Sequence, residues 1–260
     1  MKKELYIKIR QIFFVLFNGL GSIMPRKNYI ICYHSFSRVG NSYSIAPSIF
    51  KKQILSLSSK FSFVSLDEIF KANKKNCIAL TVDDGYEDVL SIMPFIEKYK
   101  IPLTIFVLGN PQQANRNELS HPGKLLNFSQ LKLLQKKGVK IGCHSMTHAN
   151  FGSLNSKQLR KEIVDSKKIL ENKLGTKIQY FAFPKGIYTK EALKYVKQSG
   201  YKAAFTVNSG AVNGIDFLTP RTIIDQFYTV DEIHALLNPM IIKVKNFLSK
   251  MQLWRVMPSI

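Results

Sequence analysis

The sequence predicts an α/β fold built on a parallel sheet, either closed into a barrel or open and doubly wound, and three observations predict it. From residue 28 onward, short apolar runs alternate with amphipathic segments of helical length. The run from Cys77 to Val82 is almost entirely apolar, as expected of a strand buried on both faces. Helical segments stop at Gly138, Gly175 and Gly200, and glycine commonly ends a helix. Repeated strand–helix units of this size indicate a parallel sheet.

The individual elements follow from the same patterns. Strands are predicted at residues 29–33, 61–64, 77–82, 103–108, 139–143, 179–183, 202–207 and 221–224. Helices are predicted at residues 47–60, from 65 onward, and at 87–98, 129–137, 156–174 and 189–199. Ser65 with Glu68, and Thr229 with Glu232, form capping boxes that mark two helix starts. The polar stretch 110–124 is predicted to be a loop near the active face.

Composition suggests one domain and an anionic partner. The chain has 260 residues, which suits a single α/β domain. Its 38 Lys and Arg against 17 Asp and Glu give a net charge of +21, which favours a membrane leaflet, an acidic polysaccharide or a nucleic acid as partner. No nucleic-acid-binding motif is present, so we expect no nucleic acid. Cys32, Cys77 and Cys143 are an odd count in apolar runs, which argues against disulfides and favours a reducing compartment.

Both ends of the chain are predicted to lie outside the barrel. Residues 1–27 show apolar residues at helical spacing after a basic start, and the apolar stretch is shorter than the ~20 residues of a spanning helix. We expect an amphipathic helix at a membrane surface, with an uncleaved signal anchor as the alternative. Residues 241–260 form a basic amphipathic segment that either contacts a membrane or packs on the barrel. The predicted location is cytoplasmic, at the inner face of the membrane, or else exported with an uncleaved anchor.

Reactive side chains follow four predicted strands. They are His34, then Asp83 and Asp84, then His144 and His148, and finally Pro184-Lys185-Gly186. In parallel α/β folds the chemistry collects beyond the carboxyl ends of the strands, so we expect these residues to lie together. Asp83 and Asp84, as neighbours on a strand, are expected to point to opposite sides.

Three of these residues suggest an open metal site. Histidines at i and i+4 suit two imidazole ligands, and Asp84 adds an oxygen, which leaves a fourth position for water. A divalent metal, with zinc the first expectation, would lower the pKa of that water toward ~7. Asp83 could then act as general base, the N–H of Lys185 could stabilise an oxyanion, and His34 could protonate a leaving amine. Each part alone has a structural explanation, since Asp-Gly is a common turn and paired histidines are often structural.

The motifs resemble those of NodB-type polysaccharide deacetylases, carbohydrate esterase family 4. Thr81-Val82-Asp83-Asp84-Gly85 resembles the motif T-F-D-D-G, and His144-Ser145-x-x-His148 resembles H-S/T-x-x-H. Residues 181–188, Phe-Ala-Phe-Pro-Lys-Gly-Ile-Tyr, resemble F-A-Y-P-x-G-x-Y. The resemblance implies a distorted (β/α) barrel of about seven parallel strands and usually zinc. It implies Asp83 as base and Asp84, His144 and His148 as metal ligands, and it suggests Tyr86, Pro184 and Tyr188 as substrate contacts.

The chain also departs from the common family pattern. The usual arginine of the third motif is missing, because Ala182 and Phe183 occupy that part of the sequence. Tyr33-His34 and Thr219-Pro220-Arg221 instead resemble segments of the exopolysaccharide N-deacetylases, a subset with circularly permuted motifs. In that case His34 is the acid, and Arg221 replaces the missing arginine and holds Asp83 ionised.

The sequence therefore predicts a deacetylase barrel over residues 28–240. Its expected reaction is the metal-dependent removal of N-acetyl groups from an amino sugar in a polysaccharide or a lipid-linked glycan. An O-acetyl esterase on the same scaffold remains an alternative. A non-catalytic glycan-binding or membrane-associated scaffold is the other alternative.

Overall fold

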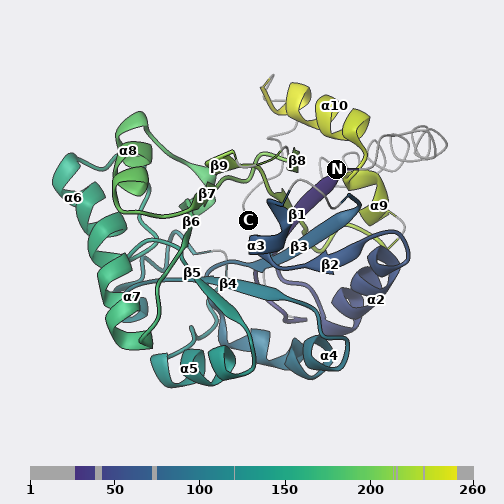
Figure 1. The fold of residues 1–260 in the computed structure, drawn as a ribbon, viewed down its shortest axis with the longest axis horizontal. Coiled ribbons are helices and arrows are strands. Elements are labelled where there is room, and N and C mark those ends of the chain that lie inside the picture. The colour runs from purple at the N-terminus through teal and green to yellow at the C-terminus, as the bar shows by residue number, and fades with distance from the viewer. Residues whose placement is uncertain are drawn as a thin grey trace.

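A single mostly parallel sheet forms the centre of the fold. The computed structural model describes residues 27–38, 43–71, 75–119, 121–212, 214, 216–230 and 232–250. The main path of the sheet runs β10-β1-β3-β4-β5-β6-β7-β9, and every pair of neighbours along it is parallel. These strands are β1 (Asn28–Tyr33), β3 (Cys77–Val82), β4 (Leu103–Val107), β5 (Lys140–Cys143), β6 (Tyr180–Ala182), β7 (Ala203–Phe205), β9 (Leu218–Thr219) and β10 (Thr222–Ile223). The sheet curls into a nearly closed barrel (Figure 1), so the predicted α/β barrel is confirmed over an open sheet.

The chain itself joins the two edges of this sheet. β9 pairs with β7 at one edge and β10 pairs with β1 at the other, and only Pro220 and Arg221 separate β9 from β10. This short connection places Arg221 where the barrel closes. The path has one strand more than the seven expected, because β9 and β10 are two short strands where the sequence predicted one. Two further strands pair with this path: β2 (Ser62–Val64) with β3, and the antiparallel β8 (Ala211–Val212) with β1.

Helices surround the barrel (Figure 1) and mostly begin where the sequence predicts. They are α2 (Pro47–Ser58), α3 (Leu66–Ile69), η2 (Glu87–Ile92), α4 (Met93–Lys98), η3 (Pro111–Gln113), α5 (Phe128–Lys136), α6 (Ser156–Arg160), η4 (Lys161–Asp165), α7 (Ser166–Leu174), η5 (Pro184–Gly186), α8 (Lys190–Gln198), α9 (Glu232–Leu236) and α10 (Pro239–Lys250). Both capping boxes are confirmed by reciprocal hydrogen bonds.

Two of the predicted helices differ in kind from the expectation. The segment predicted as a helix over 87–98 begins as the 3₁₀ helix η2 and becomes α-helical only at α4, where Pro94 occupies the first turn. Proline lacks an N–H and suits that first turn, which explains the change of helix type there. The helix over 156–174 contains a π-helical turn, η4, at its centre.

Side chains of the strands alternate between two cores. On β3, Ile78 and Leu80 belong to the large cluster between sheet and helices, whereas Cys77 and Ala79 belong to a smaller cluster with Phe106 and Phe205. The smaller cluster fills the barrel interior. The guanidinium of Arg221 lies over the rings of Phe106 and Phe205, at 5.1 and 5.6 Å from their centroids. Cys143 belongs to the outer cluster with no exposed surface, which confirms its prediction as core.

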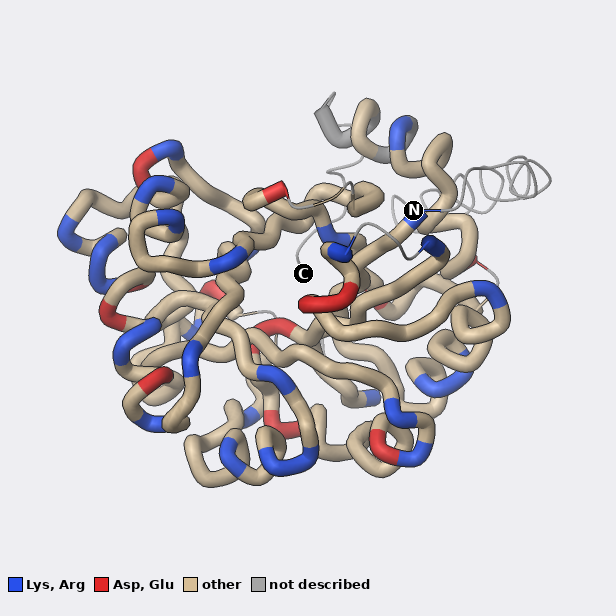
Figure 2. The backbone as a smooth tube through the Cα atoms, viewed as in Figure 1, with Lys and Arg blue, Asp and Glu red and all other residues tan. Residues whose placement is uncertain are grey.

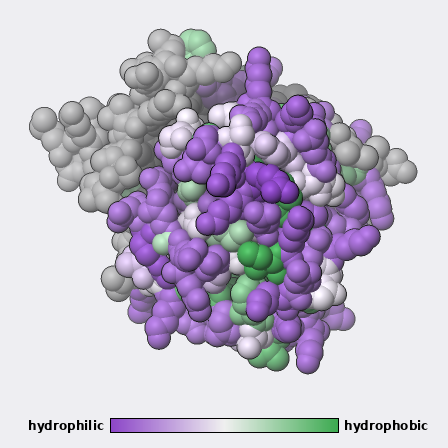
Figure 3. All heavy atoms as spheres, turned by 90° about the vertical axis from the view of Figure 1, so that its left-hand side faces the viewer, coloured by the Kyte–Doolittle hydropathy of each residue, from purple (hydrophilic) through white to green (hydrophobic). Residues whose placement is uncertain are grey.

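The surface of the described residues carries the basic charge mainly on its helices (Figure 2). The face covered by α6, α7 and α8 is mostly hydrophilic (Figure 3). Its exposed basic residues are Lys157, Arg160, Lys168, Lys173, Lys190, Lys194 and Lys197, and Glu191 is the one exposed acidic residue on these three helices. The anionic partner itself stays a prediction.

The predicted terminal segments are covered only in part. Residues 1–26 and 251–260 lie outside the described residues, so the N-terminal amphipathic helix is not described. The start of the C-terminal segment forms α10, in which Ile241 and Ile242 are buried and Phe247 is exposed. Among the described residues, no helix has both the length and the hydrophobicity needed to cross a bilayer.

Candidate metal centre and catalytic site

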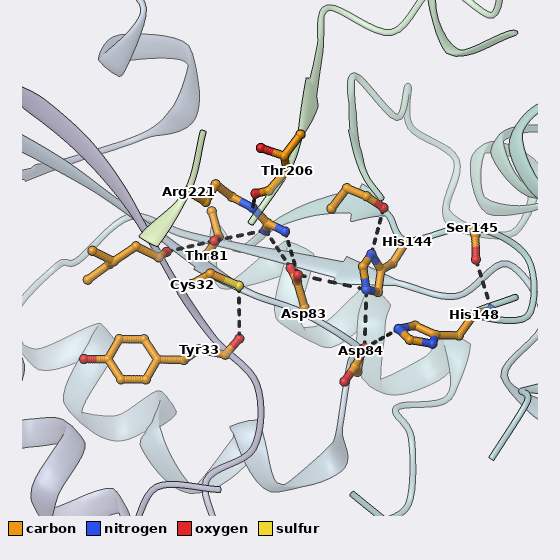
Figure 4. Close-up of polar contacts among 12 residues, drawn as sticks. Cys32, Tyr33, Thr81, Asp83, Asp84, His144, Ser145, His148, Thr206 and Arg221 are labelled. Carbon is orange, nitrogen blue, oxygen red and sulfur yellow. Dashed lines mark hydrogen bonds and ion pairs between the residues drawn. The ribbon is translucent and has the colours of Figure 1, made fainter. Parts of the chain in front are cut away.

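Asp84, His144 and His148 meet at the carboxyl ends of β3 and β5 (Figure 4). Asp84 Oδ1 lies 3.4 Å from Nε2 of His144 and 3.4 Å from Nε2 of His148. One ligand atom from each residue lies within 4.8 Å of the other two, and all three side chains are buried. The predicted ligand set is therefore brought together in space.

The donor geometry fits a tetrahedral cation. Two atoms that both bind zinc at about 2.05 Å lie about 3.3 Å apart. The two oxygen–nitrogen distances of 3.4 Å match that spacing. His144 Nδ1 lies 2.8 Å from the carbonyl of Ala182, which can only accept, so Nδ1 carries the proton and leaves the lone pair of Nε2 for a metal. Two imidazoles and one carboxylate suit zinc among several divalent metals.

The backbone has a positive φ at two of the predicted ligands, Asp84 and His148, and at Ser145 between the histidines. Asp84 has φ 67°, and both Ser145 and His148, in the loop after β5, have φ values of 71° and 63°. The positive φ of Asp84 rotates its side chain away from the alternation expected along a strand. As a result Asp83 Oδ2 and Asp84 Oδ1 both approach Nε2 of His144, at 4.0 and 3.4 Å. The expectation that the two carboxylates point to opposite sides is therefore wrong.

Asp83 is held by Arg221 at the closure of the barrel (Figure 4). The two terminal nitrogens of the guanidinium donate to the two carboxylate oxygens, each over 2.7 Å, and Nη1 also donates to Thr81 Oγ1. Both side chains are buried. Burial would raise the pKa of Asp83, but the charge of Arg221, followed by that of His144, lowers it to about 2. The structure thus brings Arg221 to the carboxylate that the sequence assigned to it.

The nearby carboxylate and imidazoles respond to the same charges. Burial opposes ionisation of Asp84, but the hydrogen bond of His144 and the charge of His148 hold the pKa of Asp84 well below its usual range. Burial lowers the pKa of His148 to about 4, although Asp84 opposes the shift. The pKa of His144 is raised, because Asp83 and Asp84 together outweigh its burial. Low proton affinity at Asp84 and His148 leaves their ligand atoms available to a cation.

His34 lies beside this group, at the end of β1. Nδ1 of His34 is buried and has no hydrogen-bond partner among the described residues. Burial lowers the pKa of His34, while the charges of Asp84 and Asp83 oppose the shift. His34 also forms a compact cluster with Cys32 and Asp83, whose ligand-type atoms lie within 4.8 Å of one another. The structure therefore places His34 next to the proposed base.

The remaining predicted residues differ in accessibility. Lys185 lies in η5 directly after β6 with φ 53°, and its side chain pairs with Glu118. Its charge also contributes to the low pKa of His148. Tyr188 is exposed, whereas Pro184 is buried. Tyr86 has no exposed surface, and its hydroxyl accepts the N–H of His121 from the loop over 110–124.

Sequence reasoning missed Glu162, a buried carboxylate on η4. It accepts hydrogen bonds from the loop between His144 and His148, namely from N of Met146, N of Thr147 and Oγ1 of Thr147. In the sequence it is one acidic residue within a helix rich in charges, and no local pattern marks it as buried.

Comparisons with known proteins show the family to which the chain belongs. A sequence profile described as polysaccharide deacetylase matches residues 70–204, which is more than half of the chain. The chain therefore belongs to the polysaccharide deacetylase family, and it is a hydrolase of that family.

Individual relatives match over most of the chain. YxkH of Bacillus subtilis is 29% identical over 198 residues, which cover 73% of this chain and 67% of YxkH. The poly-beta-1,6-N-acetyl-D-glucosamine N-deacetylase of Staphylococcus aureus is 27% identical over 216 residues, which cover 76% of this chain and 73% of that enzyme. The solved structure of IcaB from Ammonifex degensii superposes with a TM-score of 0.71 at 21% identity, covering 83% of this chain and 98% of IcaB. This last similarity shows that the fold is shared.

Proposed function

We propose that this polysaccharide deacetylase removes N-acetyl groups from an amino sugar of a polysaccharide or a lipid-linked glycan and depends on a divalent cation, most simply Zn²⁺. The observation that carries the proposal is the convergence of Asp84, His144 and His148 with Asp83 beside them. The S. aureus relative named for N-deacetylation of poly-N-acetylglucosamine supports an acetylated amino sugar as substrate.

Asp84, His144 and His148 would hold the cation. Such a cation, when bound, supplies Lewis acidity, because it lowers the pKa of water and polarises a carbonyl. The protein then has to accept a proton, stabilise an oxyanion and protonate the leaving nitrogen.

The chain offers a residue for each of these tasks. Asp83 accepts the proton of the attacking water, since Arg221 keeps its carboxylate ionised and fixes its orientation. The N–H of Lys185, in the turn after β6, donates to the oxyanion. His34 protonates the departing amine, and the exposed Tyr188 contacts the sugar.

The test is acetate release from β-1,6-linked N-acetylglucosamine oligomers by the purified, zinc-loaded protein. Asp83→Asn should lower kcat by at least about 10²-fold, the contribution typical of a general base. Glu191→Gln is the matched control, because Glu191 is exposed on α8 and bonds to Ser156. Full activity in Asp83→Asn would contradict the proposed role of Asp83, and no acetate release by the wild type would contradict the proposed substrate.

An ester substrate separates N-deacetylation from O-deacetylation. An amine is a poor leaving group without a proton, so His34→Ala should lower activity on the amide far more than on an O-acetylated sugar. Wild-type protein that hydrolyses the ester but not the amide would favour the esterase instead.

A further inference from the structure

We propose that Glu162 is a positioning residue for the cation site, an inference that rests on the metal-dependent function proposed above. Among the described residues, the carboxylate of Glu162 makes hydrogen bonds to the loop between the two histidines and none to their side chains. Its Oε2 accepts the N–H groups of Met146 and Thr147, both over 2.9 Å, and its Oε1 accepts the hydroxyl of Thr147 over 2.7 Å. These contacts fall on the two residues nearest to His148 in the turn that separates the histidine ligands.

The turn needs external support because its backbone is unfavourable. Ser145 and His148 both have positive φ, which residues with a side chain adopt rarely. The loop after β4 holds the carbonyls of the turn: N of Gly109 donates to O of Ser145, and N of Asn115 donates to O of Thr147. Glu162 accepts two N–H groups of the same turn. Together these hydrogen bonds favour the conformation in which His144 and His148 both approach Asp84.

The helix that carries Glu162 is distorted at that point. Glu162 lies in η4, a π-helical turn between α6 and α7. Such turns are rare in proteins overall, and those that occur are often found at functional sites. Two carbonyls of the π-turn share the single hydroxyl proton of Ser166, whose Oγ lies 2.6 Å from O of Glu162 and 3.0 Å from O of Ile163. The hydroxyl of Tyr201 also donates to O of Ile163, over 3.2 Å. The buried polar groups that sustain this turn suggest that its use is to deliver Glu162 to the histidine loop.

Positioning and simple structural support make different predictions. A carboxylate that only stabilises the fold would affect the unfolding of the apo-protein and leave its affinity for a cation intact. A positioning residue changes the affinity and the coordination of the cation in protein that is still folded. Because Glu162 is buried, we expect no contact between its side chain and the substrate, so KM should stay within about twofold while kcat falls.

The experiment measures binding of Zn²⁺ alone to the metal-free full chain by calorimetry, and the visible spectrum of the Co²⁺-loaded protein. Glu162→Ala should weaken Zn²⁺ binding by about 10–100-fold, as is typical when a residue that supports a ligand is lost, and should alter the Co²⁺ spectrum. Glu162→Gln should bind within about threefold of wild type, because its amide oxygen can accept both N–H groups and its amide nitrogen can donate to Thr147 Oγ1. Glu191→Gln is the control for loss of one negative charge.

Wild-type Zn²⁺ affinity and an unchanged Co²⁺ spectrum in folded Glu162→Ala would overturn this inference. If Glu162→Ala does not fold, the Zn²⁺ affinity of Glu162→Asp is measured instead. The shorter aspartate keeps the negative charge but cannot reach the loop, so wild-type affinity in Glu162→Asp would also overturn the inference. Failure of the proposed function looks different: a wild type that binds Zn²⁺ normally but releases no acetate would refute the deacetylation and leave the role of Glu162 standing.

Discussion

Arg221 and Asp83 show, at the scale of single residues, how buried charge is tolerated in this site. Each is buried, and each supplies the other with a two-pronged, charge-assisted contact. The motif residues Asp83, Asp84, His144 and His148 could be predicted because the chemistry needs those residue types at fixed spacing. Arg221 could be predicted only through its resemblance to a family segment, because it reaches Asp83 across 138 positions of sequence.

Arg221→Lys tests this contact at the residue scale. Lysine has a single ammonium group that cannot form the paired hydrogen bonds of the guanidinium, so the carboxylate of Asp83 should lose its fixed orientation. We expect kcat to fall by roughly tenfold or more and the free energy of unfolding to fall by about 1–3 kcal/mol, whereas Arg221→Ala should cost about 3–5 kcal/mol because it leaves Asp83 buried without its cation. Steady-state kinetics measure kcat, and urea unfolding measures the stability. An Arg221→Lys protein equal to wild type in kcat and in stability would refute the role of the paired hydrogen bonds.

Turns at the strand ends shape the site at the scale of elements. The predicted strands β1, β3, β4 and β5 were found within two residues of their expected bounds, because their apolar runs are long. β8 and β9 have two residues each, too short for any periodicity, and they form only because β1 and β7 already offer edges. The π-turn η4 likewise accepts hydrogen bonds from the side chains of Ser166 and Tyr201. No local sequence pattern predicts these hydrogen bonds.

Gly186→Ala tests the turn after β6 that presents Lys185. Gly186 has φ 67°, and a Cβ there would lie 2.8 Å from the backbone N of Val207 and 2.5 Å from its side chain. Gly138→Ala is the matched control, because Gly138 has φ 84° but a Cβ would meet nothing within 4 Å. Strained backbone alone costs about 1–2 kcal/mol, so Gly186→Ala should lose more stability than Gly138→Ala and should also lower kcat. Equal losses, with full activity in both variants, would show that the packing against Val207 is unimportant.

The two ends of the barrel have different tasks at the scale of the whole molecule. The proposed catalytic groups lie at the carboxyl ends of the strands, whereas a charged cluster lies at the opposite end, where β5 and β6 begin. There Asp67 accepts a hydrogen bond from the hydroxyl of Tyr180 over 2.6 Å, pairs with Lys140, and lies 3.5 Å from Lys202. The parallel sheet could be predicted as a whole, since strand–helix alternation extends over the chain. The choice of a barrel over an open sheet came from the family resemblance, and its closure through Pro220 and Arg221 could not be predicted.

Asp67→Asn should lower stability without affecting catalysis. Burial raises the pKa of Asp67, but the hydrogen bonds of Lys140 and Tyr180 outweigh it, so the pKa is lowered in the folded protein. The unfolded chain therefore binds the proton more tightly, and the stabilisation is present above the unfolded pKa of about 3.9 and is lost as the pH falls through the lower folded pKa. Because Asp67 is partly exposed, we expect no more than about 1 kcal/mol. Urea unfolding at pH 7 and near pH 3 should show the gap between wild type and Asp67→Asn closing in acid, and a constant gap would contradict this assignment.

The proposed function requires that Asp84, His144 and His148 bind one cation between them. The most direct measurement is an anomalous difference map from crystals grown with Zn²⁺. We predict a single strong peak at about 2.0–2.2 Å from Asp84 Oδ1 and from both Nε2 atoms, and its loss in His148→Ala. Saturation with Zn²⁺ that leaves this position empty, or a peak that persists unchanged in His148→Ala, would contradict the account.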